Sequence, residues 1–514
     1  MRLGIDFGTT RTVVAAVDRG NYPLLSFEAP DGSAHDWFPS LVAVRGSERV
    51  YGWDAWMRQQ EPDWTVVRSL KRVTEDAGPR TRIGIGDQSV PLLQLLAEMA
   101  RALRAQLPHE KLEVMLGVPA NANGHERFMT TEAFRVAGVD VLGILNEPSA
   151  ASIEYGHKSK GAGLLLVYDL GGGTFDASLV EMSDREHRVV VSEGISTLGG
   201  DDFDHVMAEM AAGEDLYASL NQSELFRLHE ECRIKKEALH PNTRKVVLDL
   251  DVVREGLGTV PIPVADYYER CKPLLEETVH LVEDLLAAQN VTDLEALYVT
   301  GGGSELPLVG RVLREKFGRR VKRSAYTRSA TAIGLAIQSD SQAGYVLRDH
   351  FTRYFGVWRE ADEGRTIVFD PLFPKGTSLP ARGEAALEIS RAYCPVHNVG
   401  VFRYLECSHL DEASRPAGDI TIWDEIRFPF DPSLSDVDDT PVQHVDRVRH
   451  ETIEERYACD PGGAVTVTIR NDTAGYSREY RLGRWAAKEA PITPGKPKTA
   501  RSRTKAGNHS RRVQ

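Results

Sequence analysis

The first pattern along the chain is a short apolar strand, a tight Gly-Thr-Thr turn and a second apolar strand, at residues 2–6 and 12–16. A similar pattern returns at 164–170 and 175–180, again with Gly and Thr in the turn. Each hairpin carries an aspartate at the end of its first strand. Two such hairpins predict a duplicated lobe with a ligand held between the two copies.

Helical patterns follow between and after the hairpins. Apolar positions recur with helical spacing at about 225–238 and 264–289, and an apolar strand lies at 113–118. A further strand, glycine-rich turn and helix occupy 296–317. Together these elements predict one α/β domain over residues 1–340.

Beyond that domain the pattern changes to short strands separated by Gly, Pro and Asp, for example at 366–369. Such spacing is typical of a β-sandwich. We therefore expect a linker at 341–350 and an all-β, sandwich-like domain at 351–485. Residues 486–514 are rich in Pro, Lys and Arg and poor in large apolar residues, which predicts a disordered basic tail.

Composition narrows the class of protein. The 514 residues carry a formal net charge of −13, which argues against a protein that coats nucleic acid. The apolar N-terminus is interrupted at Asp6, and there is no apolar run of the roughly 18 residues that a membrane span needs. The five cysteines are scattered without CxxC spacing, which favours reduced thiols. We expect a cytoplasmic protein without membrane or specific nucleic-acid partners.

The candidate chemistry lies in the two hairpin turns. They read Asp6-Phe-Gly-Thr-Thr and Asp169-Leu-Gly-Gly-Gly-Thr. Backbone N–H groups at a sharp glycine turn hold phosphate oxygens, and an adjacent aspartate can lie near a hydrated metal ion. One such turn is equally well structural, but two in register, with a third at Gly301-Gly-Gly, predict a nucleotide site. Neither a GxxxxGK[ST] loop nor a GxGxxG loop after the first strand occurs.

Five segments occur in the order seen in the heat shock protein 70 (DnaK-type) family. They are Asp6-Phe-Gly-Thr-Thr, Asn146-Glu-Pro-Ser-Ala-Ala, Asp169-Leu-Gly-Gly-Gly-Thr-Phe-Asp, Leu198-Gly-Gly-Asp-Asp-Phe-Asp and Thr300-Gly-Gly-Gly-Ser-Glu-Leu-Pro. They resemble the first phosphate, connecting, second phosphate, hinge and adenosine segments of that family. The resemblance covers residues 1–340 and implies an actin-like (duplicated, ribonuclease H-like) ATPase domain.

The resemblance also implies roles for individual residues. The implied catalytic residues are Lys71, Glu147, Asp169 and Thr174. The implied nucleotide contacts are Asp6, Gly8, Thr9, Thr10, Gly171, Gly172, Gly173, Thr174, Gly199, Gly200, Lys236, Gly301, Gly302 and Gly303. ATP or ADP with Mg²⁺ would be the cofactors, with K⁺ as a further candidate ion, and the residues near the metal would be Asp6, Asp169 and Asp176.

Some of these residues have simpler interpretations. Lys71 alone reads as a solvated surface lysine, although its position among the other segments favours the lysine that approaches the γ-phosphate. Glu147 could be a helix-start carboxylate instead of the group that positions attacking water. Pro119 and Arg127 match family positions that couple nucleotide state to the attached domain, but Arg127 could equally lie on the surface.

Two residues depart from the family pattern. Glu305 stands where the adenosine segment has an arginine, which removes a cation that could stack on a purine. Arg233 stands three residues before Lys236, where the family has a glutamate. These departures predict altered contacts with adenine and weaker nucleotide affinity.

The resemblance continues in the C-terminal half. Tyr345-Val-Leu-Arg-Asp takes the place of the interdomain linker, with Arg348 in place of an aliphatic residue. Phe369-Asp-Pro-Leu-Phe-Pro and Tyr457-Ala-Cys-Asp-Pro look like the start and the last strands of the peptide-binding β-domain. Because the last strand reaches Trp485 and only the basic tail follows, we expect a short member without the helical lid, which would release clients quickly.

The sequence therefore predicts a DnaK-like molecular chaperone ATPase of protein folding and stress response. Its ATP cycle would be coupled to unfolded peptide or protein clients, and co-chaperones are candidate partners. The alternatives are a nucleotide-gated scaffold or regulator with little hydrolysis and a small-molecule kinase on the same fold. ATP turnover, nucleotide-dependent capture of one partner and a phosphorylated small product would distinguish the three. Separately, the β-domain could be an interaction or structural domain without a peptide groove.

Overall fold

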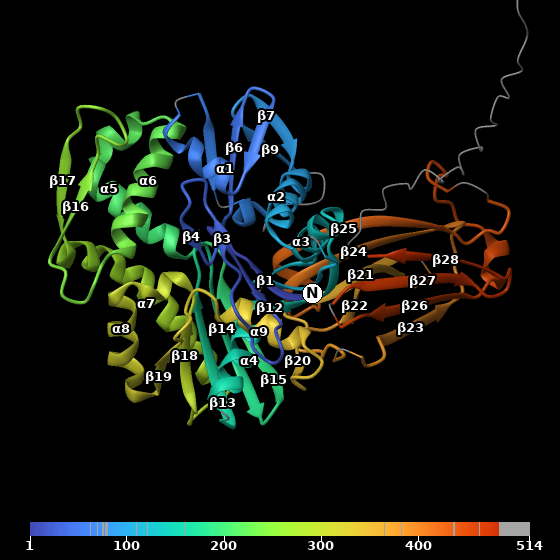
Figure 1. Cartoon of the computed structure of the whole chain (residues 1–514). Helices are drawn as coiled ribbons and strands as arrows, with labels where there is room; N and C mark the ends of the chain where they lie inside the picture. The colour runs from blue at the N-terminus through green and yellow to red at the C-terminus, as the bar shows by residue number, and fades with distance from the viewer. Residues whose placement is uncertain are drawn as a thin grey trace, which may run out of the picture.

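A computed structural model describes residues 1–482, with gaps at 62, 69, 75–76, 78–80, 109, 121, 160, 364, 382, 435–436 and 462. The predicted basic tail and the predicted absence of a lid concern residues outside this described part of the chain. The described chain forms a large α/β region and, beside it, a β-rich region coloured orange to red (Figure 1). Among the described residues, no helix combines the length and apolar character needed to cross a membrane.

The first predicted hairpin lies at the centre of a five-stranded sheet. Its two strands are antiparallel, and the first of them pairs in parallel with a later strand on its other side. The order across the sheet is β12 (Asp140–Asn146), β11 (Glu113–Val118), β1 (Arg2–Phe7), β2 (Arg11–Ala16) and β5 (Phe38–Pro39). One apolar core joins this sheet to α2 (Leu92–Gln106) and α3 (Gly124–Val136).

The second hairpin repeats this arrangement in a six-stranded sheet. Its strands are again antiparallel to each other, and the first pairs in parallel with a later strand. The order is β19 (Val321–Arg323), β18 (Ala296–Thr300), β13 (Gly163–Leu170), β14 (Phe175–Ser183), β15 (Glu186–Ile195) and β20 (Val346–Arg348). Its core includes α5 (Gly200–Ser219), α7 (Val264–Ala288) and α8 (Pro307–Phe317). The predicted duplication is thus present in both sequence and pairing.

Two helices separate the sheets and join the two lobes. They are α4 (Glu147–Ser159) and α9 (Ala330–Ser339). They pack on each other, while α9 also contacts β1 and β11, and α4 contacts β13 and β14. The helices approach so closely that a Cβ at Gly334 would lie 1.8 Å from the Ala150 carbonyl oxygen. This backbone contact fixes the start of α4, where Glu147 lies.

Smaller elements form the walls above the two sheets. On the first lobe these are β6 (Leu41–Arg45), β7 (Glu48–Tyr51), β8 (Thr65–Arg68), α1 (Trp53–Met57), the hairpin of β9 (Arg82–Ile85) and β10 (Gln88–Pro91), and the pair β3 (Phe27–Glu28) and β4 (Ala34–His35). On the second lobe they are α6 (Gln222–Glu237) and the pair β16 (Lys245–Asp249) and β17 (Thr259–Pro263). Phe226 of α6 packs with Trp64 and Val66 of the opposite lobe, so the walls touch.

The C-terminal region consists of two antiparallel four-stranded sheets that share one core. The first has the order β22 (Thr366–Phe373), β21 (Tyr354–Ala361), β24 (Val399–Leu410) and β25 (Pro416–Pro429). The second has the order β23 (Leu387–Tyr393), β26 (Ile453–Cys459), β27 (Val465–Asn471) and β28 (Tyr476–Arg481). The prediction of a mixed α/β part followed by a β-rich part is confirmed, while the exact domain limits stay a prediction.

The predicted linker lies between the two regions as an edge strand. β20 pairs in parallel with β15, and the Arg348 Nε donates to Glu186 Oε1 at 2.8 Å. The β-rich region also contacts α3, because Glu406 Oε2 accepts from the Gly124 N–H at 2.9 Å. A Cβ at Gly124 would lie 2.1 Å from the Trp423 ring, so this contact needs glycine. The second region is therefore docked on the first.

Candidate nucleotide site

A cavity of about 120 Å³ lies between the two lobes, where the hairpin turns face each other. It is lined by most of the residues predicted from the sequence: Asp6, Gly8, Thr9, Thr10, Lys71, Glu147, Asp169, Gly171, Gly172, Thr174, Gly200, Lys236, Gly301, Gly302 and Gly303. The predicted residues Gly173, Asp176 and Gly199 lie outside this lining. The fold thus gathers segments that are far apart in the sequence around one cavity.

One end of the cavity, called here the inner end, is formed by Asp6, Lys71, Glu147 and Asp169. The Lys71 Nζ donates to Glu147 Oε1 at 2.5 Å, and both side chains are largely buried, at 7% and 12% exposure. Lys71 lies in the short helix η2 (Leu70–Thr74), and Glu147 begins α4. Lys71 is therefore a buried cation between acids, unlike the solvated lysine that its local sequence favours.

Burial perturbs the acids around this lysine. It raises the pKa of Asp6 to about 7, helped by the negative charge of Glu147 and opposed by Lys71. It also raises the pKa of Asp169 well above its ordinary value, with further contributions from Glu147, Asp176 and Asp6. Lys71 loses some basicity to burial, but the charges of Glu147 and Asp6 raise its pKa overall. The inner end holds more negative than positive groups, so it favours a cation or a proton.

Asp176 lies behind this end of the cavity. Its Oδ1 accepts from the Ala120 N–H at 3.1 Å, next to the predicted coupling residue Pro119. Burial, together with the charge of Glu147, raises the pKa of Asp176 to about 7. Within the described residues, no group of three or more His, Cys, Asp or Glu side chains is arranged to hold a metal ion directly.

The predicted lysine of α6 supports the second glycine turn. The Lys236 Nζ donates to the Gly200 carbonyl oxygen at 2.5 Å and pairs with Asp204 Oδ1 at 2.8 Å. Gly200 begins α5, and the N–H groups of Gly200 and Asp201 donate to the turn at Gly171 and Gly172. Gly199 packs against the same turn, since a Cβ there would lie 2.6 Å from the Gly173 backbone. These contacts fix the shape of the second turn.

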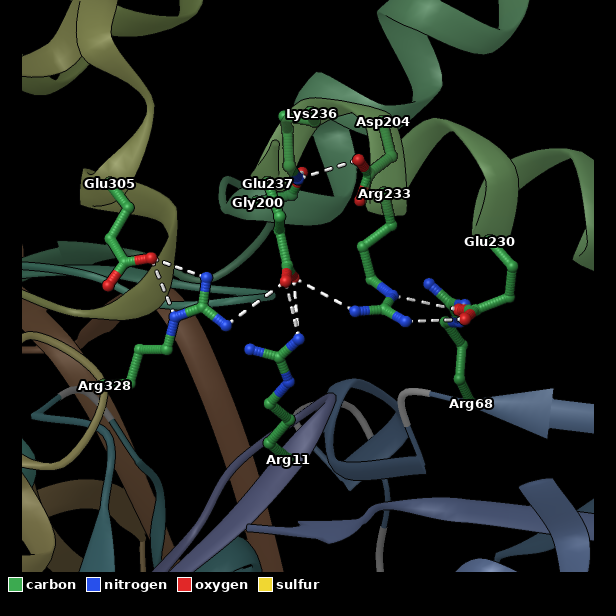
Figure 2. A network of polar contacts seen from close by, with 10 residues as sticks. All are labelled: Arg11, Arg68, Gly200, Asp204, Glu230, Arg233, Lys236, Glu237, Glu305 and Arg328. Carbon is green, nitrogen blue, oxygen red and sulfur yellow. Dashed lines mark hydrogen bonds and ion pairs between the residues drawn. The ribbon is translucent and has the colours of Figure 1, made fainter. Parts of the chain in front are cut away.

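The opposite end of the cavity, called here the outer end, is formed by Arg11, Arg233, Glu237, Glu305 and Arg328 (Figure 2). Arg11 Nη2 donates to both oxygens of Glu237, at 2.9 and 2.7 Å. Arg233 Nη1 donates to Glu237 Oε1 at 3.0 Å, and Arg328 Nη1 donates to Oε2 at 3.2 Å. Glu237 therefore links the first lobe, through Arg11, to two segments of the second.

Both departures from the family pattern are paired within this network. Arg328 Nε and Nη2 donate to Glu305 Oε2 at 2.8 and 2.5 Å, and Thr327 donates to Oε1 at 2.6 Å. The cation that residue 305 lacks is thus supplied by a segment 23 residues later. Arg233 pairs with Glu230 at 2.8 Å, and Glu230 also pairs with Arg68 of the opposite wall.

Aromatic rings support two of these arginines. The Arg11 guanidinium lies 4.6 Å from the ring centre of Trp37, which also lines the cavity. Arg233 lies 5.6 Å from the ring centre of Trp56. Although burial alone raises the pKa of Glu237, Arg11 and Arg233 lower it below its ordinary value. At the outer end each arginine is paired with a glutamate, in contrast to the inner end, where the acids outnumber the single lysine.

A second chain of contacts leads from the cavity to the linker. Arg127 is partly buried, and its Nη2 donates to Asn146 Oδ1 at 2.5 Å. Asn146, directly before Glu147, donates through Nδ2 to Asp349 Oδ2 at 2.7 Å. Burial raises the pKa of Asp349, while His350 and Arg127 oppose this. Arg127 therefore lies, partly buried, where the start of α4 meets the linker.

Comparison with known proteins agrees with this arrangement. The sequence model of the family described as Hsp70 protein matches residues 91–351, which is just over half of the chain. The chain belongs to the Hsp70 family. The family implies the actin-like ATPase fold for the two lobes, which agrees with the duplicated sheets.

Bacterial Hsp70 chaperones are among the similar proteins. "Chaperone protein DnaK" of Deinococcus deserti is 29% identical over 74% of this chain and 66% of its own length. "Chaperone protein HscA homolog" of Methylibium petroleiphilum is 32% identical over 66% of this chain and 58% of its own. "Chaperone protein HscA" of Klebsiella pneumoniae is 31% identical over the same shares. The chain spans less than two thirds of the length of these Hsp70 proteins.

Sequence reasoning missed several residues at the outer end of this Hsp70 cavity. Four of these line it, and none lies in one of the predicted glycine turns: Arg11, Trp37, Glu237 and Arg328. One signal was available: Glu305 replaces a cation, and Arg11 directly follows the first predicted turn. Their pairing through Glu237 could not be read from the sequence, because the four segments meet only in the fold.

Proposed function

We propose that this Hsp70-family chain is a chaperone ATPase that couples ATP binding and hydrolysis to the binding of peptide or protein clients. The main support is the inner end, where a buried lysine and Glu147 face acids on both hairpin turns. Such perturbed, buried groups in a cleft are typical of catalytic sites. The family names of its relatives support the chaperone assignment.

Each residue of the inner end has a distinct part in this proposal. The turns at Gly8–Thr10 and Gly171–Thr174 hold the triphosphate through backbone N–H groups, and Thr9, Thr10 and Thr174 add hydroxyl donors. Lys71 stabilises the negative charge that develops on the transferred phosphoryl group. Glu147 orients the attacking water and accepts its proton. The hydrogen bond from Lys71 holds its carboxylate in position for this.

The acids of the inner end fit a hydrated Mg²⁺. Asp6 and Asp169 line the cavity, and burial together with the charge of Glu147 raises the pKa of both, so a bound cation would stabilise their ionised forms. Asp176 lies outside the lining and would act through its negative charge, which adds to the electrostatic attraction for the cation. When bound, Mg²⁺ would neutralise charge on the triphosphate. K⁺ is a further candidate ion.

The β-rich region offers a surface for extended clients. Phe355 and Val357 of β21 enter the sandwich core, so neighbouring side chains of that strand face outward. The outer face carries Trp358 and Leu405, and it exposes Ile422, which is 73% accessible. Apolar side chains of an extended peptide could pack there while main-chain hydrogen bonds form at a strand edge. Unfolded segments are the expected class of client.

The docked linker supports coupling between the two sites. Asn146 joins Asp349 of the linker to the residue next to Glu147, so a shift of α4 on nucleotide binding would change this contact. Co-chaperones would act on the same equilibrium between the docked and the released linker. We propose a cytoplasmic location, in agreement with the scattered thiols.

Steady-state ATP turnover with and without an unfolded peptide tests this function. We expect Lys71→Ala to lower turnover by about 100-fold or more, because one charged donor to the transition state is lost. Lys111→Ala is the control, since Lys111 is 75% exposed and pairs with Asp140 far from the cavity. Equal turnover in the wild type and Lys71→Ala would contradict the assignment. Tight nucleotide binding without turnover would favour the nucleotide-gated scaffold.

A further inference from the structure

The outer end of the cavity determines how the base of a nucleotide can be recognised. A triphosphate held by the glycine turns occupies the inner end, so the base must extend toward Arg11, Glu237 and Arg328. This placement rests on the proposed nucleotide site. The groups at the outer end therefore decide which bases bind well.

The two carboxylates at the outer end are already engaged. A carboxylate has about four positions for accepted hydrogen bonds. Glu237 accepts four contacts: two from Arg11, one from Arg233 and one from Arg328. Glu305 accepts two from Arg328 and one from Thr327. Glu237 has no capacity left to read the amino group of a base as long as these pairs persist, and Glu305, which keeps one accepting position, does not line the cavity.

The remaining surfaces for the base are planar groups on which it can stack. Such surfaces do not distinguish the hydrogen-bonding groups at the edge of the base. The guanidinium groups of Arg11 and Arg328 and the ring of Trp37 line the cavity. Stacking on such groups tolerates any base, because every base has a π-face. Arginine N–H groups can also donate to N7, which adenine and guanine share.

Of the other polar groups of the lining, Asp204 and Lys236 pair with each other at 2.8 Å, and Ser329 and Asp36 do not restore selectivity. The hydroxyl of Ser329 can both donate and accept, so it suits either purine. Asp36 is exposed, and a hydrogen bond made there replaces one to water with little gain.

We infer that this Hsp70-family site does not select adenine over guanine, and that it takes purine nucleoside triphosphates as a class. The pairing of Glu237 and Glu305 by arginines causes this. The two departures from the family pattern, Glu305 and Arg233, then have one explanation. Both residues belong to a network of arginines and glutamates that pair with each other, and a base can stack on this network without hydrogen bonds that identify it.

Calorimetry of the full chain with Mg²⁺ and ATP, GTP or inorganic triphosphate tests the inference. We expect ATP and GTP to bind within about threefold of each other and inorganic triphosphate to bind more weakly, because stacking is lost. An ATP preference above about tenfold would overturn the inference, as 1.4 kcal/mol of selective contact would then exist. Binding of none of the three would instead contradict the proposed function.

Arg328→Ala tests the cause. This change frees Glu305 and part of Glu237 to accept from a base, so we expect the ratio of ATP to GTP affinity to change by about tenfold, as for a hydrogen bond to a charged group. Arg320→Ala is the matched control, because Arg320 pairs with Asp293 on the surface of the same lobe at 2.8 Å. An unchanged ratio in Arg328→Ala would also overturn the inference.

Discussion

The inner and outer ends of the cavity hold charged groups in opposite ways. At the inner end, Asp6, Glu147 and Asp169 surround the single lysine Lys71, and burial raises the pKa of both aspartates. At the outer end every arginine meets a glutamate, and the pKa of Glu237 is lowered. The inner end has fewer positive than negative groups, whereas at the outer end the charged groups are paired with each other without a ligand.

This difference separates the chemistry of the site from its closure. Buried groups that lack compensation store a preference for a ligand, so they belong to binding and reaction. Partly buried charges that compensate each other hold segments together, and this effect is weakened when one partner is removed. Substitutions at the inner end should therefore change ATP turnover, and substitutions at the outer end should change the rate of nucleotide release.

Glu147→Gln should produce the largest effect. The amide keeps the size of the side chain but cannot accept a proton from water, so we expect ATP turnover to fall by about 100-fold or more. Nucleotide affinity should change much less, because the glycine turns remain. Single-turnover hydrolysis and calorimetry on the same sample separate the two.

Glu283→Gln is the control for this variant, since Glu283 pairs with Lys316 on the surface. If Glu147→Gln weakened binding and turnover to the same degree, Glu147 would be a binding residue and the contrast between the two ends would fail.

The acids of the inner end should make Mg²⁺–ATP affinity depend on pH. The pKa of Asp6 and of Asp176 is about 7, so both hold protons below this value. Binding of a cation requires their ionised forms, and affinity should rise between about pH 6 and 8, by up to about tenfold per pH unit for each proton released. Calorimetry in buffers of different ionisation enthalpy counts these protons.

The ligand-free chain should respond in the opposite direction. Because the folded pKa of Asp6 lies above its ordinary value of 3.8, the unfolded chain loses its proton first as the pH rises. The free energy of unfolding should therefore decrease from about pH 4 to pH 7 and then level off. A flat profile for both binding and unfolding would show that these acids are not perturbed.

Glu237→Gln should produce a smaller effect, on nucleotide release. The change leaves Arg11, Arg233 and Arg328 around a neutral amide, and their repulsion favours separation of the lobes. Because Glu237 is 27% exposed, we expect only about tenfold faster release of a labelled nucleotide in stopped-flow experiments. Turnover at saturating ATP under conditions limited by chemistry should remain near the wild-type value. Slower release would contradict the assignment of closure to the outer end.

Local patterns in the sequence predicted the parts of the fold that depend on local chemistry. The strands of both hairpins appear as β1, β2, β13 and β14, and the expected helix at 264–289 is α7 (Val264–Ala288). The predicted turns with their Asp, Gly and Thr residues meet at one cavity. These features depend on the spacing of apolar residues and on glycine, which the sequence displays directly.

The outer end could not be predicted in the same way. Arg11 and Glu237 are 226 residues apart, and nothing near either residue indicates a partner. Within its own segment, Glu305 indicates the loss of a cation. In the fold, Arg328 brings a cation to the same place and pairs with Glu305. Long-range ion pairs carry no local periodicity, so they emerge only when the lobes are assembled.

The stacking of arginines on tryptophans gives this chain an intrinsic optical reporter. Indole emission responds to a nearby charge, and Arg11 lies over Trp37 while Arg233 lies over Trp56. Arg11 and Trp37 come from the first lobe, whereas Glu237, which holds Arg11, comes from the second. Any separation of the lobes would therefore release Arg11 from its anchor and alter the light emitted by Trp37, without an attached dye.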